Sequence, residues 1–146
     1  MTAQALPAQL AAIRDDFLAL EERDRLMLLL EFSNELPELP ERYRDHTDLF
    51  ERVEECQTPV YIFIEVEEDR SVHIFATAPR ESPTTRGFVS IIAQGLDGLS
   101  VEEALDVPDD FPDSIGLRRA VSPLRLRGMS AMLARTKRQL RERAPQ

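Results

Sequence analysis

The chain has 146 residues, a net charge of −9, 42% hydrophobic residues and one cysteine, which suits a single domain over residues 1–146 and excludes a disulfide framework. The negative charge disfavours general binding to nucleic acid, which requires clustered lysine and arginine. Because no apolar stretch approaches the roughly 20 residues that span a bilayer, and the start lacks a basic secretory leader, we expect a cytoplasmic protein with no membrane partner.

Two helices are expected in the N-terminal part of the chain. Apolar residues recur at helical spacing through residues 7–20, which predicts an amphipathic helix with Pro7 in its first turn. Residues 23–36 predict a second helix with a wide apolar face. This helix must end near Leu36, because the prolines that follow cannot continue it.

The central part of the chain is expected to form a β-hairpin. Residues 37–55 have no strong periodicity and predict a polar loop, which closes on a short strand around residues 50–53. The segments PVYIFIEVEED and SVHIFATA are rich in β-branched and aromatic side chains. The charged EEDR sequence between the two apolar runs suits the turn of a hairpin.

Helices are expected again in the C-terminal part. Thr84 or Thr85 can cap a helix that carries an apolar stripe. A serine caps a short helix at residues 101–107, residues 117–121 suggest a brief helix, and a long terminal helix runs onward from Leu124 with methionines as core filler. Helices, then a small antiparallel sheet, then helices indicate an α+β fold in which helices pack against one face of the sheet.

The only cysteine lies in a polar segment. Cys56 follows Glu54 and Glu55 and precedes a turn-favouring Thr-Pro pair, so we expect it on a mobile, accessible loop at the edge of a strand. A reactive thiol also needs nearby positive charge, whereas neighbouring carboxylates raise the pKa of a thiol. From these residues alone, a small buried cysteine without chemistry is the alternative interpretation.

Two arginines could supply positive charge near Cys56. Arg86 and Arg125 fall in the first turns of expected helices, where a cation opposes the helix dipole. A use at the cysteine, or a salt bridge to one of the many acids, would explain either position. The other arginines of the last segment are interpreted as a solvated helix face, because no aromatic residues interleave with them. The two histidines lie far apart in the sequence, and no metal site is expected.

Four segments resemble the SufE family of sulfur acceptors, in the same order along the chain. Around the cysteine, VEECQTPVYI is similar to the family signature V-x-G-C-Q-S-x-V-W. The others resemble the family's second helix with its L-P-E-L exit, the segment leading into its third helix, and its closing L-[ST]-P-x-R-x-[NQ]-G-x-x-x-M helix. These three are LLLEFSNELPELPERY, ESPTTRGFVSIIAQGLDGLSVEEAL and AVSPLRLRGMSAMLARTKRQL.

The resemblance implies a sulfur carrier and activator rather than a stand-alone enzyme. SufE proteins accept persulfide sulfur from a SufS-type cysteine desulfurase, whose cofactor is pyridoxal phosphate, and pass it toward a scaffold for iron–sulfur clusters. The matching acceptor is Cys56, with Gln57 beside it, while Arg125 and Arg86 match the family's basic positions. No cofactor of its own is implied, and the implied fold is the antiparallel sheet with packed helices that SufE shares with IscU-type scaffolds.

The chain departs from the family pattern around the expected site. Glu55 replaces the usual glycine, so a turn that needs positive φ there would be strained or built differently. Thr58 replaces serine, Glu81 stands where relatives have aspartate, and Arg127 replaces asparagine or glutamine. Glu81 can still support the site through a hydrogen bond made at longer reach, and Arg127 adds charge near it.

Other functions stay open on the sequence alone. An IscU-type iron–sulfur scaffold normally needs three cysteine ligands, whereas this chain has one. A non-catalytic interaction domain that regulates the desulfurase would make Cys56 incidental. Sulfur could also be relayed to another pathway, such as tRNA or cofactor thiolation.

Overall fold

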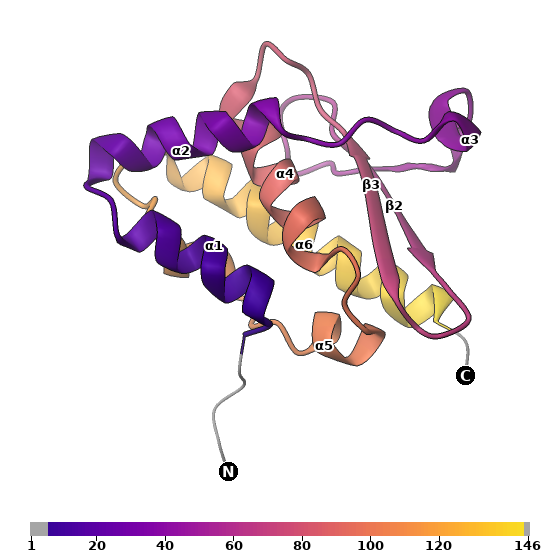
Figure 1. Ribbon diagram of the computed structural model, residues 1–146. Helices are drawn as coiled ribbons and strands as arrows, with labels where there is room; N and C mark the ends of the chain where they lie inside the picture. The colour runs from indigo at the N-terminus through magenta and orange to yellow at the C-terminus, as the bar shows by residue number, and fades with distance from the viewer. Residues whose placement is uncertain (1–5, 145–146) are drawn as a thin grey trace.

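The computed structural model of the protein describes residues 6–144, which form an α+β fold as expected (Figure 1). In chain order the elements are α1 (Ala8–Leu18), α2 (Glu22–Asn34), α3 (Glu41–Arg44), β1 (Glu51–Arg52), β2 (Tyr61–Val66), β3 (Val72–Thr77), α4 (Pro83–Leu96), α5 (Val101–Leu105) and α6 (Pro123–Arg143), with 3-10 helices at Thr47–Leu49 and Phe111–Ile115. None of the helices within residues 6–144 is long and apolar enough to cross a membrane.

The sheet has three strands in the order β1-β2-β3, and both pairings are antiparallel. The predicted hairpin and the predicted short strand before it are therefore confirmed. Successive side chains of a strand point to opposite faces, and in β2 the side chains of Ile62 and Ile64 are buried. In the register of the hairpin, Ile64 lies opposite Ile74, so the two strands bury the same face.

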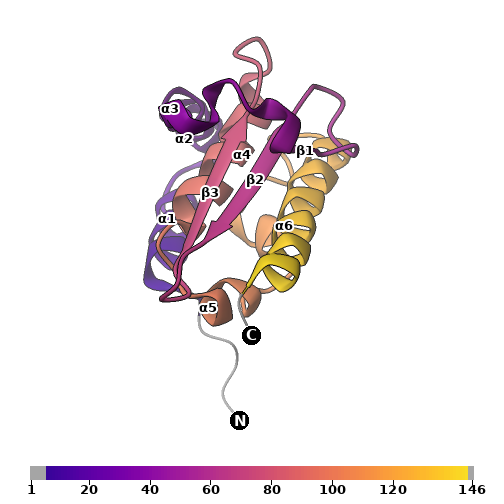
Figure 2. The same ribbon diagram turned by 90° about the vertical axis from the view of Figure 1, so that its right-hand side faces the viewer.

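The helices α4 and α6 pack on this buried face, with α1 and α2 behind α4 (Figures 1 and 2). The other face is partly covered by a small aromatic cluster. Tyr43 of α3 contacts the rings of Phe50, Phe63 and Phe75, and Phe50 stacks on Phe63, with ring centroids 5.0 to 6.2 Å apart. The segment of α3 was expected to be a loop. It becomes helical where Tyr43 can pack on the sheet, which is a tertiary effect that local periodicity does not show.

Two expectations about the C-terminal half are wrong in detail. The helix α4 begins at Pro83 with Ser82 as its N-cap, and not after Thr84 or Thr85; proline suits the first helical position because it has no amide hydrogen to leave unbonded. Residues 117–121 form turns and no helix, since so short a segment cannot offset the cost of helix nucleation.

The serine-capped helix and the buried methionines are confirmed. The Ser100 hydroxyl accepts from the Glu103 amide at 3.1 Å, and the Glu103 carboxylate accepts from the Ser100 amide at 3.0 Å. On α6, Met129 and Met132 are fully buried. The helix α6 packs on β2, and its N-terminal turn lies close to the start of α4.

Candidate functional site

The cysteine lies on a closed loop between β1 and β2. The Val53 amide donates to the Val60 carbonyl at 2.9 Å, and the Cys56 amide donates to the Val53 carbonyl at 3.1 Å. Both valines are fully buried, so they anchor the two ends of the loop in the core. The charged neighbours Glu54 and Glu55 point to solvent, whereas the Cys56 side chain turns inward and is only 7% exposed. The expectation of an accessible thiol is therefore wrong for this conformation.

The inward position of the thiol depends on a glycine of α6. A Cβ atom placed on Gly128 would lie 3.2 Å from Cys56 Sγ and 3.9 Å from Cys56 Cα. The absence of a side chain lets the loop and the helix approach this closely. A glycine inside a predicted helix costs about 1 kcal/mol relative to alanine, and this local cost is the sequence signal that could have identified the contact.

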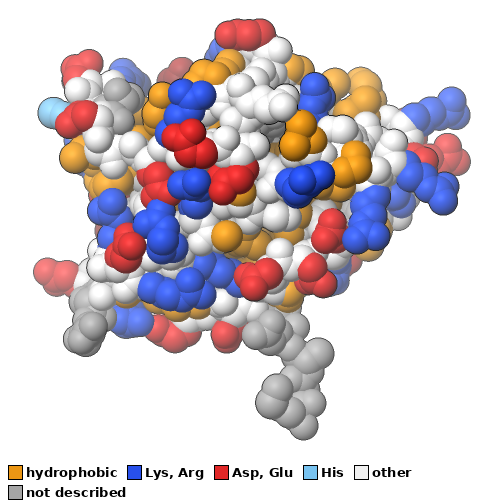
Figure 3. Space-filling view, turned by 180° about the vertical axis from the view of Figure 1, so that it is seen from behind, with side chains coloured by type: hydrophobic (Ala, Val, Ile, Leu, Met, Phe, Trp, Pro, Cys, Tyr) orange, Lys and Arg blue, Asp and Glu red, His pale blue; other side chains and the backbone are white. Residues whose placement is uncertain are grey.

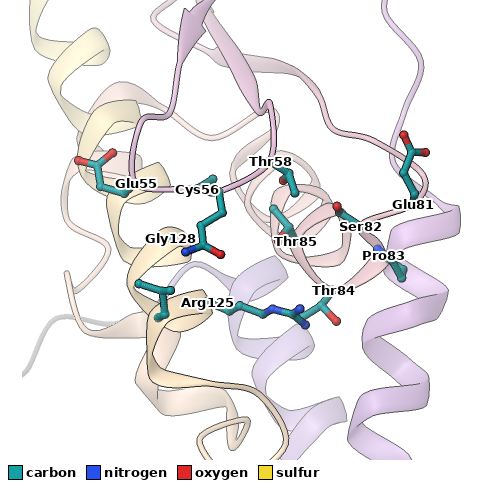
Figure 4. A pocket seen from close by; sticks show the side chains of 12 residues that line it. Glu55, Cys56, Thr58, Glu81, Ser82, Pro83, Thr84, Thr85, Arg125 and Gly128 are labelled. Carbon is teal, nitrogen blue, oxygen red and sulfur yellow. The ribbon is translucent and has the colours of Figure 1, made fainter.

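A pocket of about 210 Å³ opens beside Cys56. Three segments far apart in the sequence line it, namely the cysteine loop, the start of α4 and the start of α6 (Figure 4). The loop contributes Cys56 and Thr58, α4 contributes Thr84 and Thr85, and α6 contributes Arg125. The arrangement places a thiol, hydroxyl groups and a guanidinium around one small space.

Arg125, singled out from its position at a helix start, does line this pocket. Its backbone amide donates to the Ser122 hydroxyl that caps α6, at 3.3 Å. Its side chain is exposed and makes no ion pair with any residue in the 6–144 range. In Figure 4 the guanidinium extends from α6 toward Thr84 at the start of α4, across the mouth of the pocket. The cation is thus available to an anion in the pocket.

The other predicted site residues divide into two groups. Gln57 and Glu81 line the pocket, and neither side chain makes a hydrogen bond within the described part of the chain. Arg86 lies elsewhere: its guanidinium donates to the carbonyls of Ser33 at 2.9 Å and Ala78 at 2.5 Å. These contacts tie α4 to α2 and to the end of β3, so the position of Arg86 gives no support to its predicted role at the thiol.

The cysteine is held in its protonated form. Burial raises the pKa of the Cys56 thiol, the Glu55 carboxylate raises it further, and the balance lies at about 11 despite an opposing effect of Arg135. The expected effect of a neighbouring acid on this pKa agrees with the structure. The nearby cation, however, is Arg135, which sequence reasoning did not identify because it lies 80 residues from Glu55.

Arg135 belongs to a set of ion pairs that fastens the cysteine loop to α6, which we call the Glu51 cluster (Glu51, Glu55, Arg135 and Arg138). Arg135 Nε donates to Glu55 at 2.9 Å, and both arginines donate to Glu51. Partial burial alone would raise the pKa of Glu51, but the hydrogen bonds from the arginines and Gln139 lower it. Figure 3 shows acidic and basic side chains interspersed on this side of the molecule, so the arginines of α6 form no single-sign patch there.

Glu55, which replaces a glycine of the family pattern, does not need the left-handed backbone. Among residues 6–144, Arg70 is the only residue other than glycine with positive φ. The turn at Glu55 is therefore built differently, and its side chain is used in the Glu51 cluster instead. The hydrogen bond from Arg135 lowers the pKa of the Glu55 carboxyl and keeps it charged.

The fold and site define an α+β domain that holds one buried cysteine against a polar pocket. The model of the SufE family, described as an Fe-S metabolism associated domain, matches residues 11–140. An uncharacterized SufE-like protein of Mycobacterium tuberculosis is 50% identical over 143 residues, which cover 97% of this chain and 99% of that protein. SufE-like protein 1 of Arabidopsis thaliana, chloroplastic/mitochondrial, is 28% identical over 89% of this chain and 34% of its own length.

A solved structure has the same fold. The solution structure of a hypothetical protein from Thermus thermophilus superposes with a TM-score of 0.82 and 35% identity, over 94% of this chain and 97% of that one. The chain belongs to the SufE family. This membership confirms the resemblance read from the sequence and connects the protein with iron–sulfur metabolism.

Proposed function

We propose that the protein accepts sulfur on Cys56 from a SufS-type cysteine desulfurase, stimulates that enzyme and passes the sulfur toward an iron–sulfur scaffold. The observation that carries the proposal is the position of the chain's single cysteine, in a SufE-family chain, at a pocket that it shares with Arg125. The pyridoxal phosphate belongs to the partner enzyme, and the protein needs no cofactor of its own.

The transfer is an exchange between a persulfide and a thiol. The Cys56 thiol first loses its proton, and the thiolate attacks the outer sulfur of the persulfide carried by the desulfurase. A sulfur–sulfur bond forms at Cys56 while the bond to the desulfurase cysteine breaks. That cysteine leaves as a thiolate and takes up a proton. One sulfane sulfur atom moves: the desulfurase persulfide is reduced to a thiol as Cys56 is oxidised to a persulfide, so no external oxidant or reductant is consumed.

The loop must open for this exchange. In the closed conformation Cys56 is 7% exposed and its pKa is raised to about 11, so the thiol is both hidden and protonated at neutral pH. Contact with the desulfurase would draw the loop away from α6 and bring Cys56 to the incoming persulfide. Leu124, an apolar side chain that is 44% exposed at the rim of the pocket, is a suitable contact for the partner.

The pocket residues have distinct proposed roles. Arg125 stabilises negative charge on the sulfur, because an arginine beside an anion forms a charge-assisted hydrogen bond. Gln57, next to the acceptor, orients the loop, and Glu81 lies at the pocket rim as a support. Arg86 is a structural residue that holds the start of α4 in place.

The test is intact mass spectrometry after the protein is mixed with a SufS-type desulfurase and cysteine without reductant. We expect the wild-type chain to gain one sulfur and the Cys56→Ser variant to gain none. If Cys56→Ser still stimulated the desulfurase and the wild type gained no sulfur, the protein would be a regulator that carries none. Delivery to an iron–sulfur scaffold is then distinguished from relay to tRNA or cofactor thiolation. Each purified acceptor is supplied in turn to the sulfur-loaded protein, and transfer of the sulfur is measured.

A further inference from the structure

One ion pair is the polar attachment of the cysteine loop to the rest of the fold. The loop residues 54–59 lie between the buried anchors Val53 and Val60, which bond to each other at the base of the loop. Beyond these anchors, Arg135 Nε donates to the Glu55 carboxylate at 2.9 Å. In the part of the chain that the structure describes, no other hydrogen bond or ion pair links residues 54–59 to a residue outside the loop. The polar attachment of the loop therefore depends on two side chains.

Arg135 is held in place by a residue that does not belong to the loop. Its guanidinium also donates to Glu51, which lies in β1 before the loop begins. Glu51 accepts from Gln139 at 3.0 Å, and Gln139 accepts from the Ile64 amide of β2 at 3.1 Å. These bonds connect β1, β2 and α6 without the loop, so they keep Arg135 in position when the loop moves. Of the two carboxylates that Arg135 binds, only Glu55 leaves with the loop.

The ion pair between Glu55 and Arg135 is suited to a contact that has to break. The side chains are 48% and 24% exposed, so water competes for both, and the loss of such a pair changes an equilibrium by up to about fivefold. The family signature has glycine at the position of Glu55, and glycine has no side chain to make this contact. The ion pair is therefore an addition of this chain to the loop that the family shares.

We propose that Glu55 and Arg135 form a latch that holds the cysteine loop closed, and that these positioning residues set how often Cys56 becomes accessible. The use of the latch rests on the sulfur-acceptor function, because the desulfurase has to break it before its persulfide reaches the thiol. No covalent bond changes when the latch opens, since Glu55 exchanges the guanidinium for water. Without the latch, the thiol is exposed more often and the partner opens the loop at a lower concentration.

A double substitution separates the latch from the charges that act on the thiol. Glu55 raises the pKa of Cys56 and Arg135 lowers it, so Glu55→Gln/Arg135→Ala removes two opposing effects and keeps the net charge of the protein. Alkylation by iodoacetamide, which is uncharged, then reports how often the thiol is exposed. We expect alkylation about twofold to fivefold faster than in the wild type. The matched control is Glu142→Gln/Arg138→Ala, which removes another ion pair of α6 and should leave the rate close to that of the wild type.

Urea distinguishes opening of the loop from unfolding of the protein. Opening of a loop exposes little surface, so alkylation by this route should change little in low concentrations of urea, whereas alkylation through global unfolding rises steeply. We expect the faster alkylation of the double variant to be insensitive to urea. A rate equal to that of the wild type would overturn the proposal. So would an increase that depends steeply on urea, or one that the control variant shares.

Sulfur uptake from a SufS-type desulfurase gives the second readout. The double variant should reach half of its maximal rate of uptake at a desulfurase concentration about twofold to fivefold lower than the wild type needs, with the maximal rate little changed. Equal concentrations for the two proteins would overturn the role of the latch in transfer. Faster alkylation of the double variant, together with no sulfur uptake by either protein, would refute the proposed function and leave the latch standing.

Discussion

Two arginines of the same helix have opposite surroundings. Arg135, in the Glu51 cluster, donates to two carboxylates and helps to fasten the cysteine loop to α6. Arg125, at the start of α6, makes no ion pair within residues 6–144 and lines the pocket beside Cys56. The arginines of the cluster are therefore neutralised by carboxylates, whereas the charge of Arg125 stays available to an anion. An unpaired cation next to a nucleophile is a feature of functional sites.

Replacing each arginine by alanine should give the largest difference between the pocket and the Glu51 cluster, measured as the rate of sulfur uptake. Arg125→Ala should slow sulfur uptake by Cys56 about tenfold to a hundredfold, because a charge-assisted hydrogen bond is lost, and should change the free energy of unfolding by less than about 0.5 kcal/mol. Arg135→Ala is the matched control on the same helix. It should destabilise the fold by about 0.2–1 kcal/mol and affect uptake much less. The reverse pattern in uptake assays and urea titrations would contradict this assignment.

The contact between Gly128 and the thiol predicts a measurable coupling. Gly128→Ala gains about 1 kcal/mol of helix propensity, but its Cβ crowds Cys56 Sγ, which costs about 1–3 kcal/mol. We expect a net loss of stability and faster alkylation of Cys56. In a Cys56→Ala background the crowding is absent, so the same change should stabilise the protein by about 1 kcal/mol. Additivity in this double-mutant cycle would show that the two residues do not touch.

The charges near the thiol predict two small changes of opposite sign. Glu55→Gln removes a charge that raises the pKa of Cys56, so the pKa should fall below about 11. Arg135→Ala removes the opposing charge and should raise it. Neither change should bring the pKa near neutrality, because burial is the largest cause. The pH dependence of Cys56 alkylation measures both shifts; a thiolate at pH 7 in Glu55→Gln would indicate that the acid, and not burial, controls the group.

The smallest expected effect is on the pH dependence of stability, and it comes from His73, which lies away from the site. The hydrogen bond with Asp97 raises the pKa of His73, burial opposes this, and Glu67 adds to the increase. The extra stability is therefore fully present below the unfolded-state pKa of about 6.5 and is lost as the pH rises through the higher folded-state pKa. Because the ring is partly exposed, we expect about half a kcal/mol or less.

Urea titrations at several pH values test this prediction. The His73→Gln variant should lose the pH-dependent part of its stability, while a change at the exposed His46 serves as the control. Stability that rises with pH over this window in the wild type, and not in His73→Gln, would reverse the sign and contradict the assignment.

The parts of the molecule that the sequence predicted are those set by local pattern. The hairpin follows from two runs of β-branched and aromatic residues on either side of a charged turn, and α6 follows from the apolar residues that recur from Leu124 onward. The short helix α3 could not be predicted in this way, because it depends on packing of Tyr43 against the distant Phe75.

The sequence predicted which residues belong to the site better than it predicted how they are arranged. Cys56 and Arg125 were identified from motif and helix position, and they do share a pocket. The sequence left open whether the thiol is buried or accessible, because its burial depends on the close approach of Gly128. The pairing of Arg135 with Glu55 was not predicted, because those residues are 80 positions apart. Contacts of this kind arise from the packing of the loop on α6, which periodicity and spacing do not encode.

The most direct test of the central claim follows one sulfur atom from donor to acceptor. A SufS-type desulfurase is loaded with persulfide, freed of cysteine and mixed with an equal amount of the protein. After quenching and alkylation, the peptides of both proteins are mapped by mass. We predict that the extra sulfur leaves the desulfurase and appears on the peptide that contains Cys56. Sulfur that stays on the desulfurase, or is released as sulfide while Cys56 stays unmodified, would contradict the account.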